Sequence, residues 1–395
     1  MMNKKIHIWD VNQTETNGMS IISATVEPPN GKISKLWYSF PAEYGCQAQE
    51  NRMDAFVIAT QLMAMNLGAD LYVHGRVAPS LLRNLEEYRA IWACWRPSFY
   101  RPIDIKVDVE EELLRTEKPL GNIMAFSGGL DACFTAYRHA THLCGRQNRN
   151  IKAGVLVNFN VSPDNDQNFQ DWAEKSRKIL KSIGMEFIPV STNLNSVVKT
   201  LEMRKNKLLD DFLPKVISSL MLFQKSYDAA LIASGATYDN LSPWSTHPIT
   251  DPLLSHNAFE IIHDGAAFTR TDKTRVLKDW PEALDNLYVC WKKDINGVNC
   301  GKCPKCIRTI LNFRVVGAPL PGCFQEDISD RDILNQVKLG NNSLDSLKEI
   351  LSEAEKASIT DSWVEALRTC IQKIKFRQQF LSPIKQSFKK ISAMI

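Results

Sequence analysis

The sequence has no long apolar run and no strong excess of charge. No stretch approaches the ~20 uninterrupted apolar residues that a membrane-spanning helix needs. The first ten residues contain no apolar core of the kind that marks a signal peptide. We therefore expect a cytoplasmic protein without a membrane span. The net charge of +4 is too small to indicate nucleic-acid binding by itself, so that question stays open.

A disulfide scaffold is also excluded. Ten cysteines would suggest disulfides in a small secreted protein, but this chain has 395 residues and no export signal. A chain of this length buries a full core and commonly holds two domains. Six cysteines are scattered, and we expect them to be small buried apolar residues. The other four lie close together.

The most informative stretch begins at Asn122 and has the sequence NIMAFSGGLDA. A short apolar run ends in Ser127, Gly128 and Gly129, and a helical pattern follows. Glycines let a backbone close around an anion, and the first turn of a helix offers N–H groups and a favourable dipole to a phosphate. Asp131 would repel that phosphate unless a metal ion lay between them. The stretch predicts metal–nucleotide chemistry, although such a turn alone is often only a turn.

Strands and helices alternate after a charged linker that ends near residue 119. Apolar strands are expected at 154–159, 186–190 and 229–233, and this rhythm predicts a parallel sheet with right-handed crossovers. Ligands of open α/β sheets bind at the carboxyl ends of the strands, so we expect a nucleotide crevice there. The small or polar residues at these ends are Ser127, Asn158, Asn160, Ser191, Asn193, Ser234 and Gly235.

Residues 1–118 predict a small α+β module that does not resemble part of a nucleotide-binding sheet. Its cluster of aromatic residues is expected to pack in a core, with a partner-binding surface as the alternative. The members of this cluster are Trp92, Trp95, Phe99 and Tyr100.

Residues 321–395 predict a helical extension, with helices at 344–351 and 362–376. From Ala366 to Ile395 there are seven Lys or Arg and no Asp or Glu. This composition favours a helix pair with a basic solvent face. An acidic partner protein, nucleic acid or a membrane surface are the alternatives.

The segment 234–248 is too polar for a core and too long for a tight turn. We expect a loop that closes over the crevice on a second substrate. Asp239, Ser242 and His247 could hydrogen-bond a heterocycle, and Trp244 could stack on one. The alternative is that Trp244 packs under the loop and His247 is an ordinary surface histidine.

Three cations follow within six residues, at Arg270, Lys273 and Arg275. A solvated helix face is the default interpretation of such a run. Neutralisation of phosphate is the alternative, and under that hypothesis we assign Lys273 to ATP.

The clustered cysteines are Cys290, Cys300, Cys303 and Cys306. Three of them recur at two-residue intervals, so their sulfurs can converge on one ion, and the fourth completes a tetrahedron. This pattern predicts a structural zinc site that holds the end of the catalytic domain. An iron–sulfur cluster is the competing interpretation.

Together these motifs resemble the 7-cyano-7-deazaguanine synthase family of PP-loop ATP pyrophosphatases. The resemblance covers roughly residues 121–315 and implies a doubly wound parallel sheet of the PP-loop type at 119–320, with ATP, Mg²⁺ and Zn²⁺. Ala132 departs from the family, which has serine there. The resemblance implies that ATP and Mg²⁺ are bound by Ser127, Gly128, Gly129 and Asp131, and we expect Ser127 and Asp131 to be catalytic. We also assign to the cofactor site Leu130, Asn158, Ser234, Gly235 and Lys273.

The family forms an acyl adenylate from 7-carboxy-7-deazaguanine and passes it to an amine. Ala132, the added module at 1–118 and the extension at 321–395 depart from the ordinary enzyme. The family also has an anti-phage branch, in which the deazaguanine is joined to the N-terminal amine of a partner protein. We expect this chain to belong to that branch, because an added module is what docking of a macromolecular amine would need. The first rival is the synthase that uses ammonia for tRNA modification. The second is an inactive nucleotide-binding scaffold, which Ala132 motivates. A homodimer is compatible with each hypothesis.

Overall fold

The computed structural model describes residues 4–44, 51–115, 119–159, 161, 166–200, 210–290, 298–338 and 344–381. Within these ranges ten strands form one sheet. The strands are β1 (Lys4–Thr16), β2 (Met19–Glu27), β3 (Ser34–Pro41), β4 (Ala69–Val77), β5 (Ile105–Glu110), β6 (Asn122–Ala125), β7 (Ile151–Asn158), β8 (Glu186–Thr192), β9 (Ala229–Ala233) and β10 (Glu260–Asp264).

The described residues also form α-helices. They are α1 (Asp54–Leu67), α2 (Pro79–Trp95), α3 (Leu130–Ala140), α4 (Asp166–Ser182), α5 (Leu194–Thr200), α6 (Phe212–Met221), α7 (Arg270–Leu277), α8 (Pro281–Asn286), α9 (Pro304–Val315), α10 (Asp330–Leu334), α11 (Leu344–Lys356) and α12 (Ser362–Phe376). Among the helices of these ranges, none has the length and apolar character that a bilayer crossing requires.

The chain divides into two compact units, residues 1–267 and 268–395. The first unit holds the whole sheet, and the second holds α7 to α12. The sequence suggested boundaries between functional modules near residues 118 and 320. These boundaries differ from the division into compact units, and they stay predictions.

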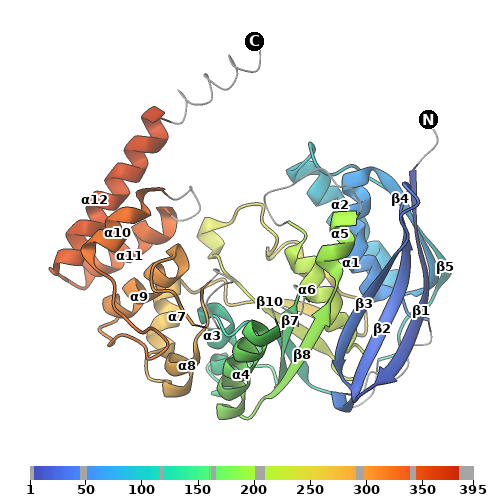
Figure 1. Ribbon diagram of the computed structural model, residues 1–395, viewed down its shortest axis with the longest axis horizontal. Coiled ribbons are helices and arrows are strands. Elements are labelled where there is room, and N and C mark those ends of the chain that lie inside the picture. Colours follow the sequence, from blue (N-terminus) through green and yellow to red (C-terminus); the bar gives the residue numbers. More distant parts are fainter. Residues whose placement is uncertain are drawn as a thin grey trace. The chain divides into compact units, whose positions relative to one another are not determined.

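The strand order is β10-β9-β6-β7-β8-β3-β2-β1-β4-β5. The five strands from β10 to β8 pair in parallel, as the alternation of strands and helices predicted. The five strands of the N-terminal residues continue the same sheet, because β3 pairs antiparallel with β8. The expectation that residues 1–118 stand apart from this sheet was therefore wrong. Figure 1 shows the strands of both halves in the first unit.

The join between the halves is short, and one side chain extends it. Only Tyr38 with Thr192 and Ser39 with Ser191 are paired across it. Beyond them, the Asn193 amide donates to the Lys35 carbonyl at 2.7 Å and accepts from the Trp37 N–H at 2.9 Å. The side chain of Asn193 thus takes over the role of a further backbone pair.

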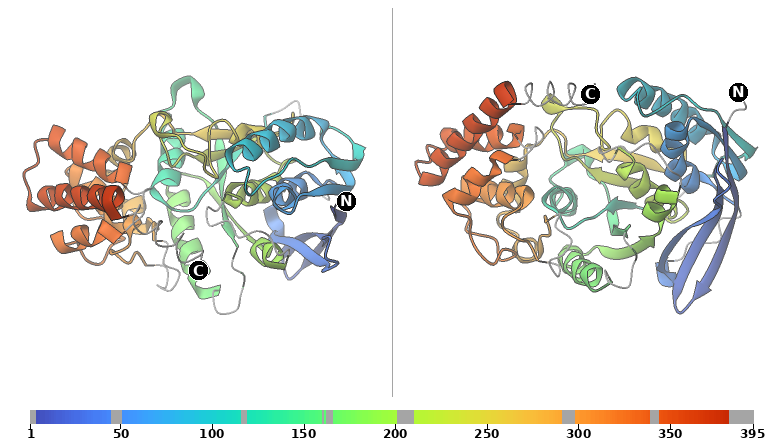
Figure 2. Two further views of the ribbon diagram at one scale, coloured as in Figure 1. Left: turned by 90° about the horizontal axis from the view of Figure 1, so that it is seen from above. Right: turned by 45° about the horizontal axis from the view of Figure 1, so that its top comes forward.

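The N-terminal strands follow from their residue pattern. Buried and partly exposed residues alternate along β2, β3 and β4, as expected for strands with one face in a core. Asn17 and Gly18 have φ of 52° and 71°, the conformation of a two-residue hairpin turn between β1 and β2. In Figures 1 and 2, α1 and α2 lie against the same side of this half of the sheet. Trp92 and Tyr100 are buried there, which confirms the predicted aromatic core.

Across the sheet, the parallel half has the strand order β8-β7-β6-β9-β10. Counted along the chain, these are its third, second, first, fourth and fifth strands. Helices α3 and α4 lie on one face of these strands and α6 lies on the other (Figure 1). Two elements of this parallel half were not predicted, β10 and α5. Strand β10 is short and polar at both ends, and α5 is a single helix of seven residues.

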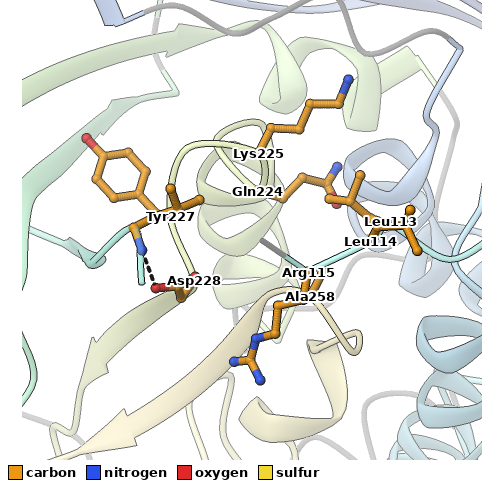
Figure 3. Close-up of a pocket in the computed structure, with 9 residues that line it drawn as sticks. Leu113, Leu114, Arg115, Gln224, Lys225, Tyr227, Asp228 and Ala258 are labelled. Atoms are coloured by element: carbon orange, nitrogen blue, oxygen red, sulfur yellow. Dashed lines mark hydrogen bonds between the residues drawn. The ribbon is translucent and has the colours of Figure 1, made fainter. Parts of the chain in front are cut away.

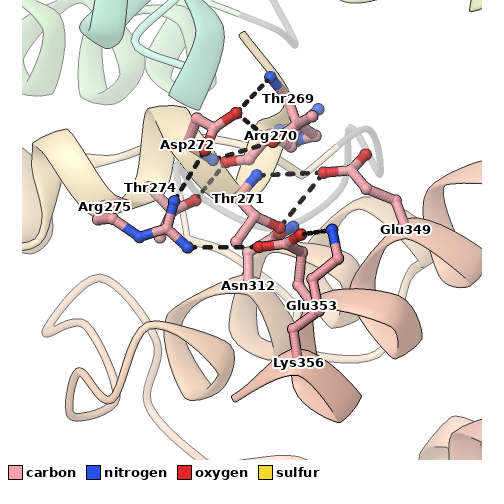
Figure 4. A network of polar contacts seen from close by, with 10 residues as sticks. All are labelled: Thr269, Arg270, Thr271, Asp272, Thr274, Arg275, Asn312, Glu349, Glu353 and Lys356. Atoms are coloured by element: carbon pink, nitrogen blue, oxygen red, sulfur yellow. Dashed lines mark hydrogen bonds and ion pairs between the residues drawn. The ribbon is translucent and has the colours of Figure 1, made fainter.

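The second unit is all helical, and polar side chains join its helices (Figure 4). Thr269 and Asp272 form a capping box at the start of α7. The Thr271 hydroxyl donates to Asn312 on α9 at 2.8 Å, while Arg275 pairs with Glu353 on α11 at 3.4 Å. Helices α11 and α12 match the predicted helices at 344–351 and 362–376. The basic residues beyond 381 lie outside the described ranges.

Candidate functional site

The strand order brings the two predicted glycine turns together. Strands β6 and β9 are neighbours, and both run toward the same edge of the sheet. Ser127 follows β6 and Ser234 follows β9, so the turns lie at adjacent carboxyl ends. The chain order reverses between these two strands, because β7 and β8 continue on one side and β10 on the other. Such a reversal is where open α/β sheets bind ligands.

The first turn has the geometry that a bound anion requires. Gly128 has φ of +65°, and α3 begins two residues later at Leu130. Ser127 is exposed, Gly129 is partly exposed and Leu130 is buried. The Gly129 N–H lies 3.4 Å from the Ser127 hydroxyl. Helix α3 therefore begins directly after an accessible turn, the position at which the N-terminal N–H groups of a helix can bind an anion.

Helix α4 braces this turn from its side. The Trp172 indole donates to the Ser127 carbonyl at 2.8 Å. A Cβ atom at Gly128 would lie 3.1 Å from the Ser176 hydroxyl and 3.9 Å from the Trp172 indole nitrogen. A larger residue at 128 would thus meet α4 as well as a strained backbone.

The other predicted ligands occupy the same edge. Asp131 lies in the first turn of α3 and is half-buried, and Asn158 is the last residue of β7. The Ser234 hydroxyl donates to the Ala236 carbonyl at 2.6 Å, which closes the second turn. Gly235 is exposed, with no atom within 4 Å of its Cβ position. Asn160 lies outside the described residues.

Asp264, at the end of β10, is a residue that the sequence did not single out. Its carboxylate accepts from Thr135 at 2.7 Å, contacts His139 at 3.3 Å and pairs with Arg138, all on α3. His139 accepts the Arg149 N–H at Nδ1, so its Nε2 carries the proton toward Asp264. This cluster fixes the helix that begins at the glycine turn.

The charge of Asp264 is maintained by that cluster. Burial acts to raise the pKa of this carboxyl, but the bond from His139 and the charge of Arg138 outweigh burial, and the net pKa is lowered. Asp264 is therefore ionised at neutral pH and holds α3 against β10. Nothing in the local sequence around Asp264 signals this role.

The loop after β9 presents three of its four predicted substrate residues to solvent. Asp239, Ser242 and Trp244 are exposed, and Trp244 retains 38% of its accessible surface. His247 is buried instead. Its Nδ1 accepts from the Ile249 N–H at 3.1 Å. The substrate roles of these residues stay predictions.

Helix α2 and the turn after it hold this loop in place. The ring of His247 meets Trp95 edge-on, with centroids 4.9 Å apart. The Arg96 guanidinium donates to the Pro243 carbonyl at 2.8 Å. Farther along, Asn84 donates to the Ser255 carbonyl at 2.9 Å. The N-terminal part of the chain therefore contacts and supports the loop that follows β9.

The predicted cation run lies on α7, in the second unit. Lys273 is buried with 2% of its surface exposed. Arg275 pairs with Asp272 at 2.7 Å and with Glu353 at 3.4 Å, so it is part of the helix network of Figure 4. The assignment of Lys273 to ATP stays a prediction.

The four clustered cysteines meet in the second unit. The sulfur atoms of Cys290, Cys300, Cys303 and Cys306 all lie within 4.8 Å of one another, a spacing that can hold a metal ion. Sulfurs of a tetrahedral zinc site, with Zn–S of about 2.3 Å, are about 3.8 Å apart. The sulfurs of Cys290 and Cys303 and those of Cys300 and Cys306 are 3.9 Å apart, and those of Cys303 and Cys306 are 3.4 Å apart. The predicted convergence is confirmed.

The chemistry of these sulfurs also fits a cation. Contact with Cys303, burial and the neighbouring sulfurs raise the pKa of Cys306 well above its usual range. Three buried thiols and the half-buried thiol of Cys300, all close together, cannot all ionise unless a positive ion lies among them.

Asn299 holds the two parts of the cluster together, and the sequence did not reveal it. Its side-chain oxygen accepts the N–H groups of Val289 and Cys290, at 2.9 and 3.2 Å. Its amide nitrogen donates to the carbonyls of Leu287 and Cys323, at 2.7 and 3.2 Å. A residue with 4% exposure thereby orients the segment that carries Cys290.

A pocket of about 240 Å³ lies at the opposite edge of the parallel strands (Figure 3). Leu120, Asp228 and Ala258, which line it, precede β6, β9 and β10. The Asp228 carboxylate already accepts the N–H groups of Leu120 and Gly121. The pocket is smaller than the 300–1,000 Å³ that ligand sites commonly have. The carboxyl edge, with its two glycine turns, is the stronger candidate.

Comparisons with protein-family models, with curated proteins and with solved structures give no match to this chain.

Proposed function

We propose that this protein is an ATP-dependent ligase of the 7-cyano-7-deazaguanine synthase type. It forms an acyl adenylate of 7-carboxy-7-deazaguanine and transfers the acyl group to an amine. The observation that carries the proposal is the pair of glycine turns at adjacent strand ends, one of which opens α3. The PP-loop type of the fold is part of the proposal.

Binding of ATP would rest on the backbone of the first turn. N–H groups at Gly129 and in the first turn of α3 would donate hydrogen bonds to phosphate oxygens, and Ser127 would lie beside them. Asp131 would hold Mg²⁺, which offsets the phosphate charge when bound. The loop that contains Trp244 would cover the heterocycle of the second substrate.

The chemistry needs positioning and charge stabilisation rather than a covalent protein group. A carboxylate oxygen of the acid attacks the α-phosphorus of ATP, and pyrophosphate leaves with the electron pair of the broken P–O bond. The amine then attacks the acyl carbon. AMP departs, the nitrogen loses its proton, and an amide remains.

Exposed apolar residues favour a macromolecular amine over ammonia. Tyr238, Leu241, Trp244 and Ile249 expose 59%, 36%, 38% and 57% of their surfaces on the loop after β9. Large exposed apolar groups in one region mark protein contacts, and ammonia needs none. We therefore place the N-terminal amine of a partner protein as acceptor, in bacterial anti-phage defence.

Pyrophosphate release tests the proposal. The purified protein with ATP, Mg²⁺ and 7-carboxy-7-deazaguanine should release pyrophosphate, and Asp131→Ala should abolish the release. Asp108→Ala is the matched control, because this carboxylate is exposed on β5. Release at background level by the unaltered protein would support the inactive scaffold instead.

The acceptor is identified by the product. A candidate partner should gain the mass of the deazaguanine acyl group at its N-terminus, which mass spectrometry detects. Formation of free 7-cyano-7-deazaguanine from ammonium, with no change of any partner, would favour the ammonia-using synthase.

For the cysteine cluster we propose structural zinc. Four thiolates suit zinc, and Cys303 and Cys306 lie at the start of α9, where a bound ion would fix the helix. Elemental analysis should give about one zinc per chain. Iron with visible absorption would identify an iron–sulfur cluster instead.

A further inference from the structure

A buried hydroxyl lies beside the glycine turn and has no assigned role. Ser176 is fully buried on α4. Its Oγ has no hydrogen-bond partner among the residues that the structure describes. The same Oγ lies 3.1 Å from the position of a Cβ on Gly128. The hydroxyl therefore faces the backbone of the turn across the gap that a glycine leaves.

An unpaired buried hydroxyl is unfavourable for the fold, because it has lost its hydrogen bonds to water without replacement. Alanine would fit the same position at lower cost. The position of Ser176 one helical turn after Trp172 is informative, since Trp172 already bonds to the Ser127 carbonyl at 2.8 Å. Two side chains of α4 thus face the turn, and one of them has an unused donor.

The motif keeps the hydroxyl of Ser127 but has none at position 132. Ala132, in the first turn of α3, is 5% exposed and offers no hydrogen bond from its side chain. A turn that closes on phosphates directs its N–H groups toward the ligand, and its carbonyls then need donors on the other side. Ser176 lies where such a donor is needed.

We propose that Ser176 is a positioning residue of the phosphate site, which rests on the proposed function. When ATP occupies the turn, the Ser176 hydroxyl donates to the turn backbone at Gly128 and fixes the phosphate-binding conformation. It compensates in this way for the hydroxyl that is missing at Ala132. Trp172 and Ser176 together form the support of the turn.

The test compares Ser176→Ala with the unaltered protein. ATP·Mg²⁺ affinity is measured by calorimetry, and the melting temperature is measured with and without ATP. Loss of one hydrogen bond should weaken ATP binding roughly fivefold. The melting temperature without ATP should stay equal or rise, because the unpaired hydroxyl is gone.

A rescue variant and a control sharpen the result. Adding Ala132→Ser to Ser176→Ala should recover most of the affinity, because it restores a hydroxyl to the same turn. Ser182→Ala is the control on the same helix, where the hydroxyl bonds to the Ile179 carbonyl at 2.7 Å, and it should leave ATP binding unchanged.

Three outcomes would overturn the inference. If the unaltered protein binds ATP and Ser176→Ala binds it equally well, Ser176 has no part in the site while the proposed function stands. If Ser176→Ala lowers the melting temperature without ATP and the ATP-induced shift is unchanged, the residue is structural. Absence of ATP binding in the unaltered protein would remove the proposed function together with this inference.

Discussion

The two candidate sites are built in opposite ways. The cysteine site uses four side chains, three of which lie within seven residues of sequence. The candidate nucleotide crevice would use mainly backbone, and its two turns are about a hundred residues apart. Side chains of one type at fixed spacing identify the first site. The second exists only because β6 and β9 are neighbours.

The supporting residues show the same contrast. Asn299 directly precedes Cys300 and bonds to segments at Leu287 and Cys323, all within its own unit. Asp264 supports the candidate crevice through its ion pair with Arg138, from which it is separated by 126 residues in the sequence. A site made from local sequence can fail by losing one ligand, whereas the crevice fails when its strands and helices shift.

Loss of the metal should give the largest effect. Cys306→Ser, or removal of metal by a chelator, should unfold the second unit, because binding of structural zinc contributes roughly 10 kcal/mol or more. Circular dichroism and hydrogen exchange would show lost helix and lost protection from α7 to α12. Cys94→Ser is the control, as this cysteine is exposed. Unchanged protection in the metal-free protein would mean that the cluster has no structural role.

Loss of the Asp264 carboxylate should destabilise the first unit. Asp264→Ala removes the partner of Arg138 inside the protein and should cost about 3–5 kcal/mol in the free energy of unfolding, measured by denaturant titration. Asp108→Ala, at an exposed carboxylate, should change it by less than about 0.5 kcal/mol. Equal effects of the two variants would show that the cluster on α3 contributes no stability.

The same carboxylate predicts a dependence on pH. Its pKa in the folded protein lies below its value in the unfolded chain. The stabilisation is therefore fully present above the unfolded pKa of about 4 and is lost as the pH falls through the folded pKa. As the pH falls below about 4, the free energy of unfolding should therefore decrease less steeply for Asp264→Ala than for the unaltered protein.

Loss of the Asn299 amide should have the smallest effect of the three. Asn299→Ala leaves the N–H groups of Val289 and Cys290 without this acceptor and should cost about 1–3 kcal/mol. Metal affinity should fall about tenfold or more, as for other residues that orient ligands. Competition with a metal indicator measures the affinity. Asn286→Ala, which removes only a bond within α8, is the control; equal affinities would show that Asn299 does not orient the site.

Sequence patterns predicted best the elements that are stabilised by residues close to one another in the chain. Helix α12 has the bounds that the sequence suggested, because it has an amphipathic pattern. Strands β5 and β10 were missed, since both are short edge strands that depend on pairing. His247 was weighed as a ligand or a surface residue, and its burial against Trp95 comes from a helix far earlier in the chain.

The sequence alone determined that strands and helices alternate after residue 119, that a glycine turn lies between a strand and a helix, and that four cysteines can share one ion. These features depend on residues close together in the chain. Tertiary structure decided that β3 extends the parallel strands through β8, that Asp264 fixes α3, and that Ser176 lies under Gly128. Such contacts are set by packing between distant segments, which no local pattern specifies.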